Sequence, residues 1–176
     1  MVLAQADKQD LFGFSRGPTL SSALENPQLV NEFLAPLNSD ALGEMTEIWL
    51  NASKDGNCSS WIGLDLFGHA HLQANTYLLD YSKAEDKYYA RFLGQEIVDR
   101  TGLDVTGKCH EDMAQGAQLE QWIGVSDYCR LNEAVCTVAF DWSFIDKSYV
   151  KVWNAVFPLS SNGEITQLCG FYIWEA

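Results

Sequence analysis

The sequence lacks any apolar run close to 18 residues, so no transmembrane helix is expected. It also lacks an excess of positive charge, because 11 Lys and Arg stand against 24 Asp and Glu and give a net charge of -13. Such a surface repels phosphate groups, which argues against nucleic acid and anionic membranes as partners. The first residues, MVLAQADKQD, contain no apolar signal-peptide core, so we expect a cytoplasmic protein.

Familiar catalytic and redox signatures are also missing. No two of the five cysteines form a CxxC pair and their number is odd, so reduced thiols that fill the core are expected. The chain has no P-loop, no Gly-x-Gly-x-x-Gly, no nucleophile elbow and no Ser-His-Asp order. The sequence therefore predicts no enzyme and assigns no catalytic residue.

What the chain does contain is typical of a globular domain: 176 residues, 47% of them apolar. Start signals at Asn26-Pro27 and Asn38-Ser39-Asp40 and a stop at Gly56 predict two short helices over 27–56. Alternating and aromatic-rich runs over 76–93 predict a β-hairpin. A helix is predicted over 112–130, and three strands over 134–176, the last two joined at Asn162-Gly163.

This order of elements predicts an α+β fold with a single five-stranded antiparallel sheet and helices on one face. Large apolar residues occur at both parities of one predicted strand, since Trp153 and Phe157 alternate with Val152 and Val156. The second face of the sheet must therefore also be covered. The N-terminal helices or a second subunit are the two candidates for that cover.

Two segments carry a resemblance to a known family. RFLGQEIVDRTGLDVTGK (91–108) contains an Arg, a Gly and a Gly-x-Asp-x-Thr-Gly pattern. KVWNAVFPLSSNGEITQLCGFYIW (151–174) contains a Trp-Asn pair, an Asn-Gly hairpin and a Gly in its last strand. Together they resemble the PAS sensory domain, in particular a group of short stand-alone bacterial PAS-like proteins. The resemblance covers 73–176 and leaves 1–72 as an N-terminal tail and helical extension.

The resemblance implies a fold with a pocket. A PAS-like domain has five antiparallel strands in the order 2-1-5-4-3, with helices over one face and a pocket between sheet and helices. Some members of the family hold haem, flavin or a small metabolite there. Others hold no known ligand and act as dimerisation or protein-interaction modules.

The chain departs from the flavin photoreceptor branch of that family. The reactive cysteine of that branch lies three residues after a glycine, but here His110 holds that place after Gly107 and Cys109 comes one residue early. Asn154 matches the flavin-contacting asparagine, whereas Tyr172 replaces the glutamine of the last strand. We expect no flavin photochemistry and no haem, and the cofactor is unknown.

Aromatic and apolar residues give the best candidates for a pocket. The candidate ligand-binding residues are Phe92, Met113, Trp122, Phe140, Trp142, Asn154, Val156 and Tyr172. Asn154 is the most informative, because an amide at an inward-facing strand position needs a hydrogen-bond partner. A ligand, the backbone or a water molecule would each supply one, and a plain core remains the alternative reading of the whole set.

Histidines are the obvious candidates for metal binding. His69 and His71 form a His-Ala-His motif, and Cys109 and His110 are further candidates. The spacing matches no known metal site, so no metal site is assigned and surface histidines are expected.

The resemblance implies a stand-alone PAS-type sensory or signalling domain, and we expect it to have no effector of its own. Its expected partners are a small hydrophobic or aromatic ligand, a protein signalling partner and a second copy in a homodimer, with no nucleic acid and no membrane insertion. One alternative is a ligand-free dimerisation module that uses Trp153, Phe157 or the N-terminal helices. Another is a small-molecule enzyme that uses the same pocket, with Asp141 and His110 as its candidate groups.

Overall fold

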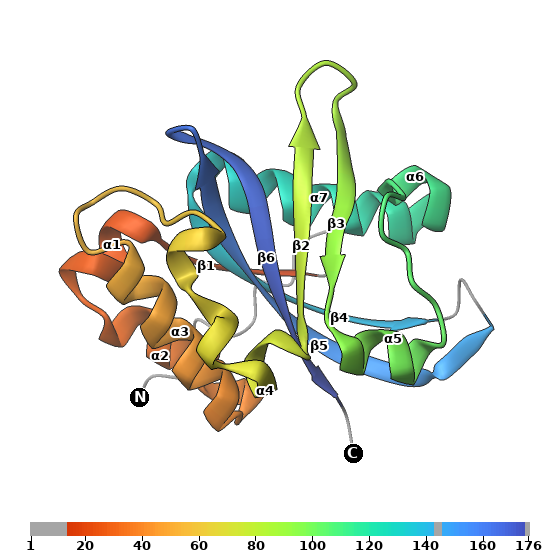
Figure 1. Ribbon diagram of the computed structural model, residues 1–176, viewed down its shortest axis with the longest axis horizontal. Helices are drawn as coiled ribbons and strands as arrows, with labels where there is room; N and C mark the ends of the chain where they lie inside the picture. Colours follow the sequence, from red (N-terminus) through yellow and green to blue (C-terminus); the bar gives the residue numbers. More distant parts are fainter. Residues whose placement is uncertain (1–13, 143–145, 175–176) are drawn as a thin grey trace.

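An antiparallel sheet forms the centre of the molecule and helices lie against both of its faces (Figure 1). The computed structural model describes residues 14–142 and 146–174, with the backbone alone for 147–151. The strands are β1 (Phe14–Thr19), β2 (Thr76–Ser82), β3 (Lys87–Leu93), β4 (Ala134–Trp142), β5 (Lys147–Ser161) and β6 (Glu164–Trp174). The α-helices are α1 (Leu20–Glu25), α2 (Gln28–Leu34), α3 (Asp40–Ala52), α4 (Ala70–Gln73), α5 (Gln95–Thr101), α6 (His110–Met113) and α7 (Gly116–Asn132). Three short 3-10 helices are η1 (Ala35–Leu37), η2 (Ile62–Leu64) and η3 (Leu66–Gly68).

The sheet has six strands in the order β1-β4-β5-β6-β2-β3, so the expected number of five is wrong and the whole sheet differs from the expected one by an added strand. Without that strand, and with β2 counted as strand 1, the order read from the β3 edge is the expected 2-1-5-4-3. The added strand is β1, which pairs with β4 at one edge, while the other five lie in the order β4-β5-β6-β2-β3. This segment belongs to 1–72, where a tail and a helical extension were expected and no strand was. A proline cannot donate to a ladder and is tolerated at a sheet edge, and the register of β1 shifts between Arg16 and Thr19.

Burial along β5 explains why helices cover both faces. Residues 154–159 are buried without interruption, which is the pattern of a strand between two layers. Ala155 and Phe157 pack into a core with α1–α3, whereas Val156 packs into a core with α7. Helices therefore lie on both faces and not on one, and the N-terminal helices, one of the two expected candidates, cover the second face.

The N-terminal helices are held to the sheet through α3. The Ser39 hydroxyl accepts a hydrogen bond from the backbone N–H of Leu42 at 3.2 Å, which confirms the predicted helix start. On the buried side of α3, the Trp49 ring lies 5.4 Å from that of Phe157, centroid to centroid. The Trp49 indole N–H donates to the carbonyl oxygen of Pro158 at 3.0 Å. Helices and sheet thus share one core.

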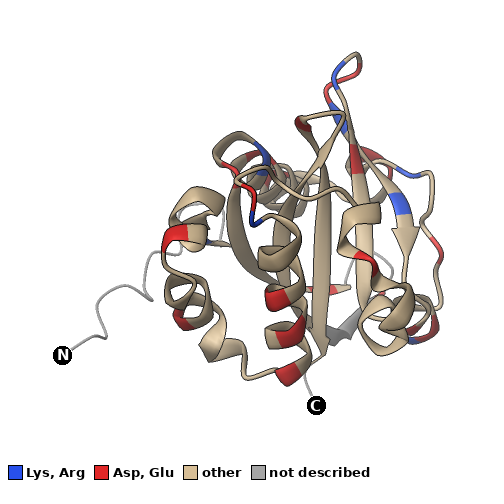
Figure 2. Ribbon diagram, turned by 60° about the vertical axis from the view of Figure 1, so that its left-hand side comes forward, with Lys and Arg blue, Asp and Glu red and all other residues tan. Residues whose placement is uncertain are grey.

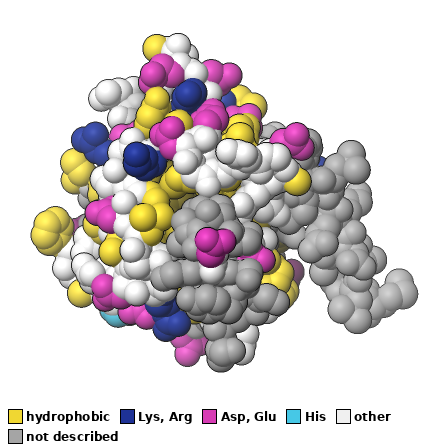
Figure 3. Space-filling view, turned by 90° about the vertical axis from the view of Figure 1, so that its right-hand side faces the viewer, with side chains coloured by type: hydrophobic (Ala, Val, Ile, Leu, Met, Phe, Trp, Pro, Cys, Tyr) yellow, Lys and Arg dark blue, Asp and Glu magenta, His cyan; other side chains and the backbone are white. Residues whose placement is uncertain are grey.

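The surface carries the net negative charge in a dispersed form. Asp and Glu residues lie on helices and loops all over the molecule and do not gather in one segment (Figure 2). On the face shown in Figure 3, hydrophobic side chains are interspersed with charged and polar ones. Among the described residues, no helix combines the length and the apolar character that crossing a bilayer requires.

Candidate functional site

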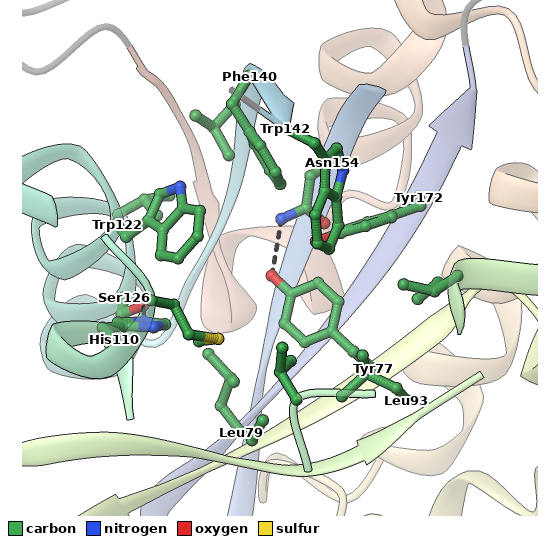
Figure 4. A pocket seen from close by; sticks show the side chains of 16 residues that line it. Tyr77, Leu79, Leu93, His110, Trp122, Ser126, Phe140, Trp142, Asn154 and Tyr172 are labelled. Atoms are coloured by element: carbon green, nitrogen blue, oxygen red, sulfur yellow. Dashed lines mark hydrogen bonds between the residues drawn. The ribbon is translucent and has the colours of Figure 1, made fainter. Parts of the chain in front are cut away.

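A cavity of about 60 Å³ lies between the sheet and helix α7, and α5 and α6 close its sides. Side chains from the strands and from α6 and α7 point toward a common centre (Figure 4). A water molecule needs about 10–15 Å³ of such space, so this cavity has room for several water molecules. A ligand of a few non-hydrogen atoms therefore fits without movement of the walls.

Most of the residues predicted from the sequence meet at this cavity. Six of the eight line it: Met113, Trp122, Phe140, Trp142, Asn154 and Tyr172. The aromatic rings among them meet edge to face: the centroid of the Phe140 ring lies 5.6 Å from that of Trp122 and 5.7 Å from that of Tyr172. The aromatic residues thus form a continuous wall from α7 across β4 to β6.

Phe92 does not line the cavity, contrary to the prediction. Leu78 pairs with Phe92 and the next residue, Leu79, pairs with Ala90, so Arg91 is an extra residue in a β-bulge. The bulge turns Phe92 to the opposite face from Ala90, where its ring lies 5.5 Å from that of Trp61. A regular strand would have kept Phe92 and Ala90 on one face.

Val156 lies on the correct face of the sheet but also outside the cavity. It is buried in the core beneath α7, and its carbonyl oxygen accepts a hydrogen bond from the Cys129 thiol at 3.7 Å. The prediction failed because Cys129 belongs to the buried side of α7 and fills the space above this position.

Asn154 provides the central polar group of the cavity. Its side chain is 3% exposed, and its Nδ2 donates to the hydroxyl oxygen of Tyr77 at 2.7 Å (Figure 4). Its Oδ1 has no hydrogen-bond partner within the described part of the chain. Gly170 makes this pair possible, because a Cβ there would overlap the Tyr77 ring, which lies across β6. Burial also raises the pKa of the Tyr77 phenol, so the pair is neutral.

His110 adds a second polar group. Its ring stacks on Tyr88 at 5.6 Å and meets the edge of Trp122 at 5.5 Å, and its Nε2 lies 3.3 Å from the Ser126 hydroxyl oxygen. Its Nδ1 has no hydrogen-bond partner among the described residues. Burial lowers the pKa of His110 to about 4, so the imidazole is neutral at pH 7.

The cavity carries no formal charge. Among the described residues, no Asp, Glu, Lys or Arg lines it, and Asp141 is not part of its wall. His110 and Ser126 form the only histidine–serine contact there, and a catalytic triad would need an acidic group at the Nδ1 of His110. The lining thus suits binding of a neutral molecule better than activation of a nucleophile.

The structure also places the remaining sequence candidates. His110 lines the cavity, whereas Cys109 precedes α6 and its backbone N–H donates to the Asp112 carboxylate at 3.1 Å. His110 was named from the sequence as a candidate group of this pocket, but the role of Tyr77 was missed. A partial signal for Tyr77 was present, because Gly170 interrupts a predicted strand and a glycine there leaves room for a large side chain from a neighbouring strand.

His69 and His71 do not line the cavity and meet a third group, Glu44 of α3. Nδ1 of His69 is 2.9 Å from Oε1 of Glu44, and Nε2 of His71 is 2.8 Å from Oε2. The hydrogen bond with His71, and then that with His69, holds the pKa of Glu44 below its usual range. The sequence motif gave no indication that α3 supplies this carboxylate.

Fold and site together define an α+β protein with helices on both faces of an antiparallel sheet and a neutral, aromatic-walled cavity between the sheet and α7. No protein-family model matches the chain, and no curated protein matches it either.

Proposed function

We propose that this protein is a PAS-like signalling domain that binds a small neutral ligand between the sheet and α7. The observation that carries this proposal is the unpartnered Oδ1 of Asn154 in an apolar, aromatic-walled cavity. The proposal keeps the ligand class expected from the sequence, an apolar or aromatic body, and adds one hydrogen-bond donor. It includes no cofactor.

The energetics favour an occupied cavity. A buried acceptor without a partner costs about 1–3 kcal/mol, and a ligand that donates to Oδ1 recovers much of that free energy. A charged ligand would lose its hydration without meeting an opposite charge, because His110 is neutral and no charged side chain lines the described wall. The ligand is therefore neutral, with a donor group at one end.

Two routes connect the cavity to the surface. His110 stacks on Tyr88, whose hydroxyl donates to Asp127 of α7 at 2.6 Å and accepts from Arg130 at 2.8 Å. On β5, the cavity residue Asn154 is followed by Ala155, which packs under the N-terminal helices. Ligand binding would change the relative populations of two packing arrangements of α7 and of these helices on the sheet. A partner protein or a second copy would bind one of these arrangements more tightly.

A second candidate function is a ligand-free interaction module. Ile62 and Phe67, in the 3-10 turns between α3 and α4, are 88% and 93% exposed and offer apolar contact to a partner. Phe157, which the sequence offered as a dimer contact, is fully buried against Trp49 and is not available at the surface.

The test is native mass spectrometry of the full chain beside denaturing mass spectrometry of the same sample. We expect an added mass that is lost on denaturation in the wild type and in the control variant Phe92→Leu, which lies outside the cavity. Asn154→Leu, similar in size but without the amide, should lose it. Circular dichroism of each variant checks that the fold is kept.

A weakly held ligand calls for a probe. Pyrazole is a small neutral ring with one donor and one acceptor nitrogen, and it should shift the indole N–H resonances of Trp122 and Trp142 in NMR spectra. Asn154→Leu should abolish these shifts. No retained mass together with no shift at these two tryptophans would refute the proposal and leave the interaction module.

A further inference from the structure

The cluster of Glu44, His69 and His71 has the composition of a metal site. We propose that these three residues bind a divalent transition-metal ion, with Zn²⁺ as the expected ion. This inference is independent of the proposed ligand cavity, because none of the three residues lines that cavity.

The donor atoms are of the right kind and lie at a suitable spacing. Two imidazole nitrogens and one carboxylate oxygen form a familiar zinc-binding set, with a water molecule as the fourth ligand. Bonds of about 2.0 Å in a tetrahedron place neighbouring donor atoms about 3.3 Å apart. The three donor atoms lie within 4.8 Å of one another, and the carboxylate oxygens of Glu44 are already 2.8–2.9 Å from the two nitrogens. Small side-chain rotations open the space for an ion.

The backbone that carries these donors is anchored. Glu44 follows buried Leu42 and precedes buried Met45 on α3, so its position on the outer side of the helix is set by the core. The carbonyl oxygen of His69 accepts from the backbone N–H groups of Leu72 and Gln73 at 3.0 Å, which fixes the start of α4. Positions held in this way lose little entropy when an ion binds.

Ion binding would replace the present hydrogen bonds between the two imidazoles and Glu44. In the metal-free arrangement each imidazole donates its proton toward Glu44. An ion would take the lone pairs of these same nitrogens, and each proton would move to the other nitrogen of its ring, which faces away from the carboxylate. The side chains of Glu44 and His71 are 39% and 59% exposed, so ion and water reach the site directly.

A bound ion would join two parts of the fold. It would link α3 to the start of α4, and α4 leads directly into β2, where the Thr76 hydroxyl donates to the carbonyl oxygen of Leu72 at 2.8 Å. The ion would therefore stiffen the connection between the N-terminal helices and the sheet. Its role is structural or regulatory.

The experiment is isothermal titration calorimetry of ZnCl₂ into the reduced full chain in a buffer that does not bind metal. We expect one equivalent to bind. Glu44→Gln should weaken binding at least about tenfold, and the double variant His69→Ala, His71→Ala should abolish the site. Glu47→Gln, an exposed acid one turn further along α3, is the matched control and should bind as the wild type does.

Thermal unfolding provides a second readout. Zn²⁺ should raise the Tm of the wild type and of Glu47→Gln but not that of the double variant. The proposal is overturned if the wild type binds no Zn²⁺ up to about 1 mM. It is also overturned if the double variant binds as well as the wild type, or if Glu47→Gln weakens binding as much as Glu44→Gln.

Discussion

Burial of His110 as a neutral imidazole makes the stability of this protein depend on pH in a predictable direction. The pKa of this histidine falls from 6.5 to about 4 on folding because the ring is desolvated. The unfolded chain therefore binds more protons than the folded protein between these two values. The stabilising effect of His110 is fully present above pH 6.5 and is lost as the pH falls toward 4.

The magnitude follows from the size of the shift. Each pH unit between the two pKa values corresponds to about 1.4 kcal/mol, so the whole interval amounts to about 3 kcal/mol. Between about pH 7.5 and about pH 5 the expected loss is about 2 kcal/mol, or about 4–8 °C in Tm for a chain of this length.

The test is the free energy of unfolding in urea, measured at both pH values for the wild type and for His110→Gln. The surface carboxylates contribute equally to the pH dependence of both proteins, so the difference between the two reports His110. The wild type should lose about 2 kcal/mol more stability on acidification than this variant, which keeps a polar group but cannot titrate. Equal losses in the wild type and His110→Gln would show that the imidazole is solvated, and the argument for a neutral cavity would fail.

Three further predictions concern stability. Gly170→Ala should lower the free energy of unfolding in urea by about 2–4 kcal/mol, because its methyl group displaces the Tyr77 ring. In the Tyr77→Ala background the same substitution should cost under about 1 kcal/mol. Additive costs in this double-mutant cycle would contradict the contact. Ser39→Ala should cost about 1 kcal/mol through loss of the helix cap, whereas the exposed Ser21→Ala should cost less than about 0.5 kcal/mol. Phe157→Ala should cost about 3–5 kcal/mol and leave the oligomeric state unchanged in light scattering; a change of oligomeric state without loss of stability would show that Phe157 is a surface contact.

Features fixed by neighbouring residues were predictable from the sequence. Ser39 caps α3 as expected, because its hydroxyl and the N–H that it accepts from are three residues apart. Asn162 and Gly163 connect β5 to β6 with φ angles of 54° and 81°, the left-handed conformation for which these two residue types are selected. In both cases the physical cause lies within a few residues of its effect.

Features fixed by distant partners were not predictable in the same way. The bulge at Arg91 exists only in the pairing of β3 with β2, and it moves Phe92 to the other face of the sheet. Segment β1 is a strand because it pairs with β4, more than 100 residues away. This pairing outweighs the low strand propensity of Gly17 and Pro18. No local pattern contains this information.

The same distinction between local and distant causes applies to the residues of the candidate site. Asn154 was predicted because an amide at an inward position of a strand is unusual in itself. The surroundings of His110 follow from the rings of Tyr88 and Trp122, which the tertiary fold brings against it. The sequence identified His110 only as a candidate metal ligand and as a candidate group of a small-molecule enzyme. The approach of Tyr77 to Asn154 likewise depends on the pairing of β2 with β6 over Gly170.

The two edges of the sheet determine whether copies of the protein can join through their backbones. On the β1 side, Pro18 has no N–H to offer to an added strand, and Arg16 places an exposed charge on the same edge. On the β3 side, the backbone of Ala90 already exchanges hydrogen bonds with Gly107 and Lys108, at 2.7 and 2.9 Å. Neither edge offers an uninterrupted ladder, so a sheet rich in β-branched and aromatic residues is protected against edge-to-edge aggregation.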